Sequence, residues 1–225
     1  HQAAKQDEAA MITTGLLGGS FNPAHGGHRA ISVNAMKALG LDEMWWLVSP
    51  GNPLKPQAGM APLHARAASA RAQARRTPIK PTTIEQDLGT RYTVDTLAAL
   101  VRKYPNRRFI WIMGADNLIQ FPKWREWRRI AHLMPIAIIA RPSYNGRTHA
   151  AQAMGWLRAH VRPADQKLQW TNWRPPALVF LRFSPDARSA TTIRQADPRW
   201  LEHYARRVTR DPVTHRLLGL GMKER

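Results

Sequence analysis

The sequence predicts an α/β protein built on a doubly wound parallel sheet. Short, continuous apolar runs alternate along the chain with stretches of helical composition. Strands that are apolar at every position are typical of a parallel sheet that is covered on both faces, and right-handed crossovers place the covering helices. Unusual polar residues also gather just after several of these runs, where an open parallel sheet binds its ligands.

Six apolar segments are predicted as strands. The strongest is 109–113, which ends at Gly114, and 136–140 is apolar throughout, whereas 80–85 is the weakest. The first run ends on Gly18-Gly19, and the second is followed by a loop rich in Pro and Gly. The predicted strands are 12–17, 44–48, 80–85, 109–113, 136–140 and 177–183.

Helices are predicted between and after the strands. Gly40 is a stop signal after the helix at 30–39, and Thr93 is a candidate N-cap for a helix that ends before Pro105. That helix carries Val94, Leu97, Leu100 and Val101 at helical spacing, which predicts one buried face. The remaining predicted helices are 63–76, 124–133 and 197–208.

The chain length favours a single domain. With 225 residues and a mass of 25.5 kDa, the chain can bury a substantial core. We predict a leader or tag remnant at 1–11, one domain at 12–208 and a C-terminal tail at 209–225. Within the domain, residues 143–176 are predicted as a basic insertion that contains Trp156, Trp170 and Trp173, with some helix around 150–160.

The charge balance favours anionic partners. There are 34 Lys and Arg residues against 15 Asp and Glu residues, so the formal net charge is +19. Nucleic acid, nucleotides, phosphorylated metabolites and an anionic membrane surface are all compatible with such a charge. The absence of Cys excludes a disulfide scaffold, a thiolate zinc site, an iron–sulfur cluster and a catalytic cysteine. No run is long enough to span a bilayer, and the start lacks the apolar core of a signal peptide, so we expect a cytoplasmic protein.

The segment 18–28 is the strongest candidate for phosphate binding. It follows a predicted strand, opens a helix and is rich in Gly, which lets backbone N–H groups approach a phosphate near a helix start. His25 and His28 are three residues apart and can both donate hydrogen bonds to phosphoryl oxygens. A metal site is the alternative for this pair, although no acidic or third His ligand lies nearby in the sequence. The segment is neither a Walker A loop nor a dinucleotide fingerprint.

The same segment carries a family signature. Ser20-Phe21-Asn22-Pro23-x-His25-x-Gly27-His28 resembles the first signature of the nucleotidylyltransferase superfamily. Ser189-Ala190-Thr191-Thr192-Ile193-Arg194, about 160 residues later, resembles its second signature. The departures are Arg188, where the family usually has an apolar residue, and Ala190, which replaces a common Ser. Neither departure removes Ser189, Thr191 or Arg194.

The middle of the chain narrows the resemblance to one family. Over about residues 12–205 the chain is similar to bacterial nicotinate-nucleotide adenylyltransferases. This resemblance implies a Rossmann-like nucleotidylyltransferase fold, with transfer of the adenylyl group of ATP to nicotinate mononucleotide to give deamido-NAD and pyrophosphate. The segments that carry it are Val48-Ser49-Pro50-x-Asn52-Pro53-Leu54-Lys55, Tyr92-Thr93-Val94-Asp95-Thr96-Leu97, Trp111-Ile112-Met113-Gly114-Ala115-Asp116-Asn117-Leu118 and Phe121-x-x-Trp124-x-x-Trp127.

The resemblance also implies roles for particular residues. His25, His28, Lys55 and Arg194 are the expected catalytic residues, and Mg²⁺ is the expected cofactor, bound through the ATP phosphates rather than by a metal site of the protein. Asp116 is expected on the ATP ribose, with capping of a helix at 117–121 as the alternative. The residues expected to bind ATP are Gly18, Gly19, Phe21, His25, His28, Gly114, Asp116, Ser189, Thr191 and Arg194.

The acceptor site is assigned in the same way. Trp124 is expected to stack on the pyridine ring, whereas Trp127 is interpreted as core packing of a short helix. Thr93 is expected at the nicotinate carboxylate, and Arg141 could add positive potential. The residues expected to bind nicotinate mononucleotide are Ser20, Asn22, Asn52, Lys55, Thr93 and Trp124.

Other functions stay open at this point. A nucleotidylyltransferase that uses nicotinamide mononucleotide, or both pyridine nucleotides, fits the same motifs. Phosphopantetheine and a CTP donor are disfavoured by the segment 111–124. A basic nucleic-acid-binding module is the alternative from another class. It is the weaker hypothesis, because the charge is dispersed and no helix-turn-helix, zinc-finger or RNA-recognition signature is present. The oligomeric state is not predicted.

Overall fold

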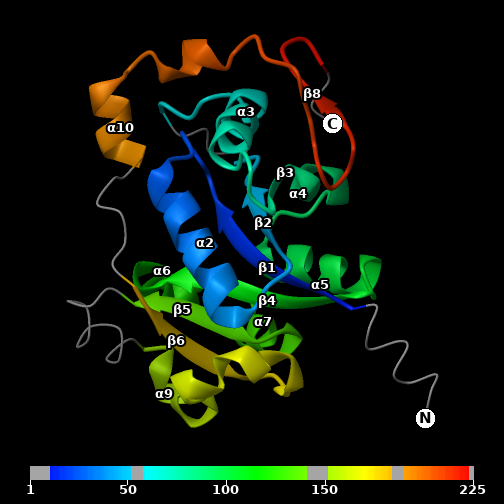
Figure 1. Ribbon diagram of the computed structural model, residues 1–225, viewed down its shortest axis with the longest axis vertical. Coiled ribbons are helices and arrows are strands. Elements are labelled where there is room, and N and C mark those ends of the chain that lie inside the picture. The colour runs from blue at the N-terminus through cyan, green and yellow to red at the C-terminus, as the bar shows by residue number, and fades with distance from the viewer. Residues whose placement is uncertain (1–10, 52–57, 141–151, 184–189, 223–225) are drawn as a thin grey trace. The chain divides into compact units, whose positions relative to one another are not determined.

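A six-stranded sheet organises the structure (Figure 1). The computed structural model describes residues 11–51, 58–140, 152–183 and 190–222, and for 190–192 it describes the backbone only. The strand order is β3-β2-β1-β4-β5-β6, and the β2/β3, β4/β5 and β5/β6 pairs are parallel. This order reverses between β1 and β4, as in doubly wound folds, so the predicted fold class is confirmed.

All six predicted strands are present in the sheet. β2 and β5 are buried at every position, which explains why 44–48 and 136–140 are apolar throughout. Glu43, the first residue of β2, is also buried, and its carboxylate accepts a hydrogen bond from the hydroxyl of Thr14. β1 continues through Gly18-Gly19, where the sequence suggested that it had ended. The strands are β1 (Ile12–Gly19), β2 (Glu43–Val48), β3 (Ile79–Thr82), β4 (Arg107–Gly114), β5 (Ile136–Ala140) and β6 (Leu178–Arg182).

Helices connect the strands. α2 (Gly26–Leu39) ends at Gly40, as predicted, and the positive φ of 63° at Gly40 explains why Gly stands there. The other α-helices are α3 (Leu63–Gln73), α4 (Ile84–Leu88), α5 (Thr93–Lys103), α6 (Ala115–Gln120), α7 (Trp127–Leu133), α9 (Met154–Leu157) and α10 (Ala190–Ala196). Short 3₁₀ segments are η1 (Phe121–Lys123), η2 (Arg158–His160), η3 (Ala164–Asn172) and η4 (Trp200–His203).

The chain divides into two compact units, each made of three segments. The first unit comprises His1–Leu16, Ala35–Glu43 and Tyr92–Phe183, and the second comprises Leu17–Asn34, Met44–Arg91 and Ser184–Arg225. The predicted boundaries at 12–208 and 209–225 stay predictions. Residues 209–218 contain a hairpin of β7 (Thr209–Arg210) and β8 (Leu217–Leu218).

The first unit packs helices on β4, β5 and β6. α6 contacts β4 and β5, and α5 packs on α7. Helix appears at 154–160, in agreement with the helix predicted around 150–160, while residues 143–151 lie outside the described part of the chain. In η3, the indole N–H of Trp170 donates to the carbonyl of Leu39 at 2.9 Å, so this part of the predicted insertion is anchored in the core.

In the second unit, the Ala-rich helix α3 contacts β3 and the first strand of the C-terminal hairpin, β7. The indole N–H of Trp46 in β2 donates to the hydroxyl of Ser32 in α2 at 2.8 Å. Asp211 is 2% exposed, and one of its carboxylate oxygens accepts hydrogen bonds from the hydroxyl of Thr82 and the backbone N–H of Thr83, at 3.0 and 2.8 Å. The chain after 208 is therefore joined to β3.

Four local predictions were wrong. Thr93 is the first residue of α5 and not its N-cap, because Tyr92 takes that position. Val101 is 38% exposed, so the buried face of α5 is narrower than expected. Trp124 has extended backbone angles and precedes α7. No α-helix covers 197–208, where the structure has only the short 3₁₀ segment η4, because Pro198 lacks an amide hydrogen and disfavours helical angles at Asp197, so α10 ends at Ala196.

Candidate active site

The loop after β1 is organised around a buried aromatic ring. Phe21 is 2% exposed and has a positive φ of 50°. Its ring stacks on Trp46 with a centroid distance of 5.1 Å and lies 4.6 Å from the ring of His28. A Cβ added at Gly19 would lie 3.3 Å from the Phe21 ring, so this glycine permits the close packing. The buried ring of Phe21 therefore packs against the ring of His28 and supports it.

Backbone hydrogen bonds fix the orientation of both histidine rings. The backbone N–H of His25 donates to Nδ1 of His28 at 3.1 Å, and that of Gly27 donates to Nδ1 of His25 at 3.0 Å. A neutral ring whose Nδ1 accepts a hydrogen bond carries its proton on Nε2. The two rings lie 3.8 Å apart and present Nε2–H donors. This protonation favours oxygen acceptors over a metal ion, which would need a nitrogen lone pair.

His28 is neutral at physiological pH. Burial, and to a lesser extent the nearby His25, lowers the pKa of His28 from 6.5 to about 3. The carbonyl of His25 also accepts from the backbone N–H of His28, at 3.1 Å, so helix α2 begins within the pair. A neutral donor with a fixed proton can stabilise phosphoryl oxygens without a change of its own charge.

Arg194 brings the second signature to the first. Its guanidinium donates to the backbone carbonyl of Asn22. The side chain of Asn22 is occupied at both ends, because Nδ2 donates to the carbonyl of Gly59 at 3.0 Å and Oδ1 accepts from the N–H of Ala61 at 3.1 Å. These bonds place Asn22 at the junction of the loop after β1, the segment before α3 and helix α10.

Several expected residues lie outside the described part of the chain. Asn52, Lys55, Arg141, Arg188 and Ser189 fall in the segments that the structure does not describe, as does the side chain of Thr191. Among the expected ATP residues that the structure does describe, Gly18 and Gly19 are the last two residues of β1. Ser20 is exposed and follows them directly.

Two residues of helix α3 that the sequence analysis missed form hydrogen bonds with the loop after β1. Arg66 is 1% exposed and donates to the carbonyls of Ser20 and Ser49 from Nη1 and to that of Ala61 from Nε. Ser69 is also 1% exposed and accepts from the N–H of Ala24 at 3.1 Å. No sequence signal separates Arg66 from the other arginines of this Ala- and Arg-rich segment.

Trp124 lies in an aromatic cluster of the first unit. Its ring meets Phe121 edge to face at a centroid distance of 5.3 Å, and it meets Trp111 in the same way at 6.3 Å. Trp127 packs on Phe121 and Trp156 at 5.4 and 5.5 Å, which matches its interpretation as core packing. Trp124 is half-buried, so part of its ring surface stays accessible.

The segments that contain Thr93 and Trp124 meet through the neighbours of these two residues. The guanidinium carbon of Arg125 lies 4.7 Å from the centre of the Tyr92 ring, a cation–π contact. Tyr92 precedes Thr93 and Arg125 follows Trp124. The structure thus brings together two segments that the sequence analysis assigned to one ligand, and it adds the cation of Arg125, which that analysis did not single out.

Gly114 and Asp116 occupy the turn from β4 into α6. Gly114 ends β4 and is also the N-cap of α6, so Asp116 does not cap this helix. The carboxylate of Asp116 is in the first helical turn and exposed. Its alternative interpretation as a helix cap is therefore wrong, and its expected role at the ATP ribose stays a prediction.

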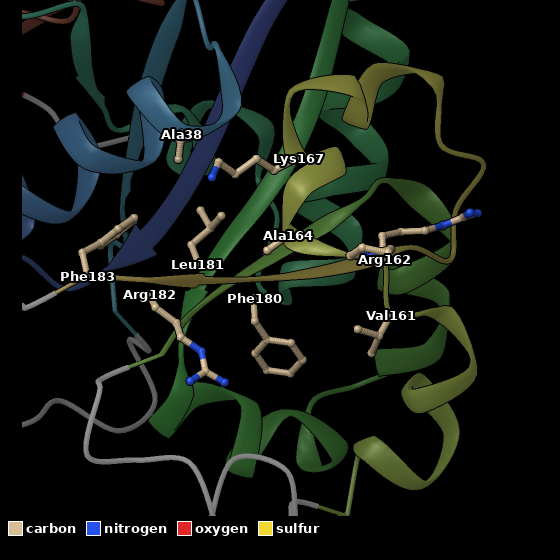
Figure 2. Close-up of a pocket in the computed structure, with 10 residues that line it drawn as sticks. Ala38, Val161, Arg162, Ala164, Lys167, Phe180, Leu181, Arg182 and Phe183 are labelled. Atoms are coloured by element: carbon tan, nitrogen blue, oxygen red, sulfur yellow. The ribbon is translucent and has the colours of Figure 1, made fainter.

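A separate pocket lies beside β6 (Figure 2). Phe180 and Arg182 project from one face of this strand, and Leu181 and Phe183 project from the other. Lys167 also lines the pocket. None of the residues expected to bind a substrate lines it. Within the described ranges there is no group of three or more His, Asp or Glu side chains that could hold a metal ion, and no helix there is long and apolar enough to cross a bilayer.

Sequence comparison identifies relatives over most of the chain. The model of the cytidylyltransferase-like family matches residues 16–196. A probable nicotinate-nucleotide adenylyltransferase of Erythrobacter litoralis is 59% identical over 92% of this chain and 95% of its own length. One from Parvibaculum lavamentivorans is 49% identical over 82% of this chain and 92% of its own length.

Structural comparison supports the fold. A Plasmodium falciparum nicotinic acid mononucleotide adenylyltransferase complexed with NaAD superposes with a TM-score of 0.59. The match covers 82% of this chain and 83% of that chain, with 15% sequence identity. At this identity the likeness shows a shared fold, in agreement with the strand order.

Proposed function

The chain belongs to the nicotinate-nucleotide adenylyltransferases, and from this membership we propose that it transfers the adenylyl group of ATP to nicotinate mononucleotide. The products are deamido-NAD and pyrophosphate. The observation that carries the proposal is the histidine pair, whose two Nε2–H donors are fixed by backbone hydrogen bonds. Such donors suit a reaction in which negative charge builds up on phosphoryl oxygens.

The proposed reaction is a direct in-line displacement at the α-phosphorus of ATP. An anionic phosphate oxygen of nicotinate mononucleotide forms the new P–O bond. The bond between the α-phosphorus and the oxygen that bridges to the β-phosphate breaks, and its electron pair leaves on pyrophosphate. Because the nucleophile is already an anion, no general base is needed, and the work of the protein is alignment and charge stabilisation.

The histidines act as neutral hydrogen-bond donors, whereas Arg194 acts through its positive charge. His28, whose pKa of about 3 keeps it neutral, donates from Nε2 to the α-phosphoryl oxygens, and His25 donates beside it. Arg194 supplies a permanent positive charge for the β- and γ-phosphates, together with Ser189 and Thr191. Its hydrogen bond to the Asn22 carbonyl supports this assignment, because it fixes the guanidinium at residues 20–28, which we call the histidine loop.

The acceptor is proposed to bind at Trp124 and Thr93. Trp124 stacks on the pyridine ring and Thr93 contacts the carboxylate, with Asn52 and Lys55 on the phosphate of the same nucleotide. The contact between Tyr92 and Arg125 supports this pairing, because it joins the two segments in the first unit. Arg125 also adds a positive charge next to the proposed carboxylate position.

Mg²⁺ is proposed to enter with ATP. Phosphate oxygens are the hard ligands that Mg²⁺ prefers, and in such sites the ion is held mainly by the substrate. When bound there it neutralises charge on the phosphates and on the leaving pyrophosphate. Loss of turnover on chelation, with recovery on addition of Mg²⁺, tests this point. The proposed place of the reaction is the cytoplasm, which fractionation of the source cells would test.

The experiment that tests the function is pyrophosphate release from ATP and Mg²⁺, with nicotinate mononucleotide and nicotinamide mononucleotide in parallel. We expect release with the acid to exceed release with the amide by far, with deamido-NAD identified by mass. Comparable rates would keep the reaction but make the assignments of Thr93 and Trp124 too narrow. No release with either nucleotide would refute the proposed acceptor.

A further inference from the structure

We propose that Arg66 is a positioning residue that holds the histidine loop and the loop after β2 in one arrangement and so aims the two Nε2–H donors. It touches neither substrate in this proposal and acts through backbone carbonyls. Only the activity arm of the test depends on the proposed function, because ring orientation can be measured without substrates.

The first support is the distribution of three hydrogen bonds that Arg66 donates. Nη1 donates to the carbonyls of Ser20 at 2.8 Å and Ser49 at 2.6 Å, and Nε donates to the carbonyl of Ala61 at 2.8 Å. Ser20 follows β1, Ser49 follows β2, and Ala61 precedes α3. One planar guanidinium therefore joins three segments that are remote in sequence.

The second support is that α3 reaches the histidine loop at a second point. Ser69 is one helical turn after Arg66, so both side chains lie on the same face of α3. The Ser69 hydroxyl donates to the carbonyl of Arg66 at 2.8 Å and accepts from the N–H of Ala24. Ala24 directly precedes His25, whose own N–H holds the ring of His28.

A third contact closes the network. Ala61, whose carbonyl accepts from Arg66, donates its N–H to the Oδ1 of Asn22. The loop after β1 is thus held by Arg66 at Ser20, by Ala61 at Asn22 and by Ser69 at Ala24. Each of these positions is adjacent to, or within a few residues of, the histidine pair.

The chemistry of a guanidinium explains why Arg is required. Burial of a charge is costly unless hydrogen bonds compensate it, and a shorter apolar side chain would remove the donor that Arg66 supplies to three carbonyls. Lys keeps the charge but carries its donors on one nitrogen, which cannot span three carbonyls in a plane. Arg66→Lys therefore removes the geometry while it retains the charge.

The test compares Arg66→Lys with Arg71→Lys, a matched change on the same helix at a half-exposed position. Imidazole ¹⁵N NMR without substrates reports the protonation and pKa of His25 and His28, and steady-state kinetics report kcat. We expect Arg66→Lys to raise the pKa of His28 from about 3 towards 6.5 and to lower kcat by roughly 10- to 100-fold, with little effect of Arg71→Lys.

Unchanged imidazole signals and kcat in a folded Arg66→Lys protein would overturn the proposal and leave Arg66 as a stabilising core residue. If that variant does not fold, Ser69→Ala decides, because it removes the bond to Ala24 and keeps the guanidinium. A shift of the His25 or His28 signals in Ser69→Ala supports positioning from α3, and unshifted signals refute it. If the wild-type protein releases no pyrophosphate, the proposed function fails while the NMR comparison still decides the role of Arg66.

Discussion

The histidine loop of the second unit and the aromatic cluster of the first unit are built by different forces. In the loop, directional hydrogen bonds from backbone N–H groups hold both imidazoles. In the cluster, Trp124 is held by packing against other aromatic rings, and the buried indole N–H of its neighbour Trp111 has no hydrogen-bond partner among the described residues. The loop therefore fixes the direction of a donor, whereas the cluster fixes the position of a flat surface.

This difference predicts where each region contributes to the reaction. A donor with a fixed direction stabilises charge that develops in the transition state, so its loss should lower kcat. A flat apolar surface binds a ring equally well before and during the reaction, so its loss should raise KM. Substitutions in the histidine loop should therefore mainly lower kcat, whereas substitutions in the aromatic cluster should mainly raise KM.

The largest effect is expected at His28. His28→Ala should lower kcat by roughly 10²- to 10³-fold, as for the loss of one preorganised donor, and should leave the fold intact. Steady-state pyrophosphate release measures the loss, and circular dichroism checks the fold. His203→Ala, at an exposed histidine of the same unit, is the control. Wild-type kcat in His28→Ala would show that the phosphate site lies elsewhere.

The next effect is expected at Trp124. Trp124→Ala should raise the KM for nicotinate mononucleotide roughly tenfold or more, because stacking of a base on an aromatic ring is worth about 1–3 kcal/mol, while the KM for ATP changes less. Trp127→Ala is the matched control, because Trp127 packs in the same cluster and should mainly lower the melting temperature. Equal changes in both KM values would identify Trp124 as structural.

A stability effect of intermediate size is expected at Glu85. Burial raises the pKa of Glu85 from 4.5 to about 7. The folded state thus binds a proton that the unfolded state has released, and stability is full below pH 4.5 and declines as pH rises to 7. Glu85→Gln should stabilise the protein at pH 8 by at most about 3 kcal/mol and have little effect at pH 4. Denaturant unfolding at both pH values measures the difference, and an equal gain at both would contradict the cause.

His28 gives the opposite dependence on pH. Its folded pKa of about 3 lies below the usual 6.5, so its contribution is present above pH 6.5 and is lost as pH falls towards 3. His28→Asn should reduce the loss of stability at acid pH, while Glu85→Gln should reduce the loss of stability at alkaline pH. Unfolding curves from pH 4 to 8 for both variants distinguish the two groups, and a profile that neither variant changes would reject both assignments.

The smallest effect is expected at Arg125. Arg125→Ala should raise the KM for nicotinate mononucleotide about two- to fivefold, because an exposed cation–π contact is worth about 0.5–1 kcal/mol. The KM for nicotinamide mononucleotide should change less, because the amide carries no charge. Arg128→Ala, which removes a cation from the rings of Trp127 and Trp156, controls for a general loss of positive charge. The same change in KM for acid and amide would exclude a role for Arg125 in reading the carboxylate.

Local patterns in the sequence predicted much of the fold. β5 was predicted with its observed bounds, because every residue from Ile136 to Ala140 is buried and apolar. Errors arose where local signals compete. Thr93 is a good capping residue, yet the extended backbone of Tyr92 gives Tyr92 that position. The helix predicted at 197–208 had suitable composition, but Pro198 stops α10 just before it.

The sequence motifs predicted the candidate site, but they did not predict the residues that hold it in place. The sequence alone determined the fold class and the two signatures, and it led to the prediction that a His pair beside a Gly-rich turn donates hydrogen bonds to phosphates. Only the tertiary structure decided which nitrogen of each ring carries the proton, that Arg194 reaches the Asn22 carbonyl, and that Arg66 is buried. The physical reason is that strand and helix patterns repeat within a few residues, whereas Arg66 meets Ser20 across 46 positions of the sequence.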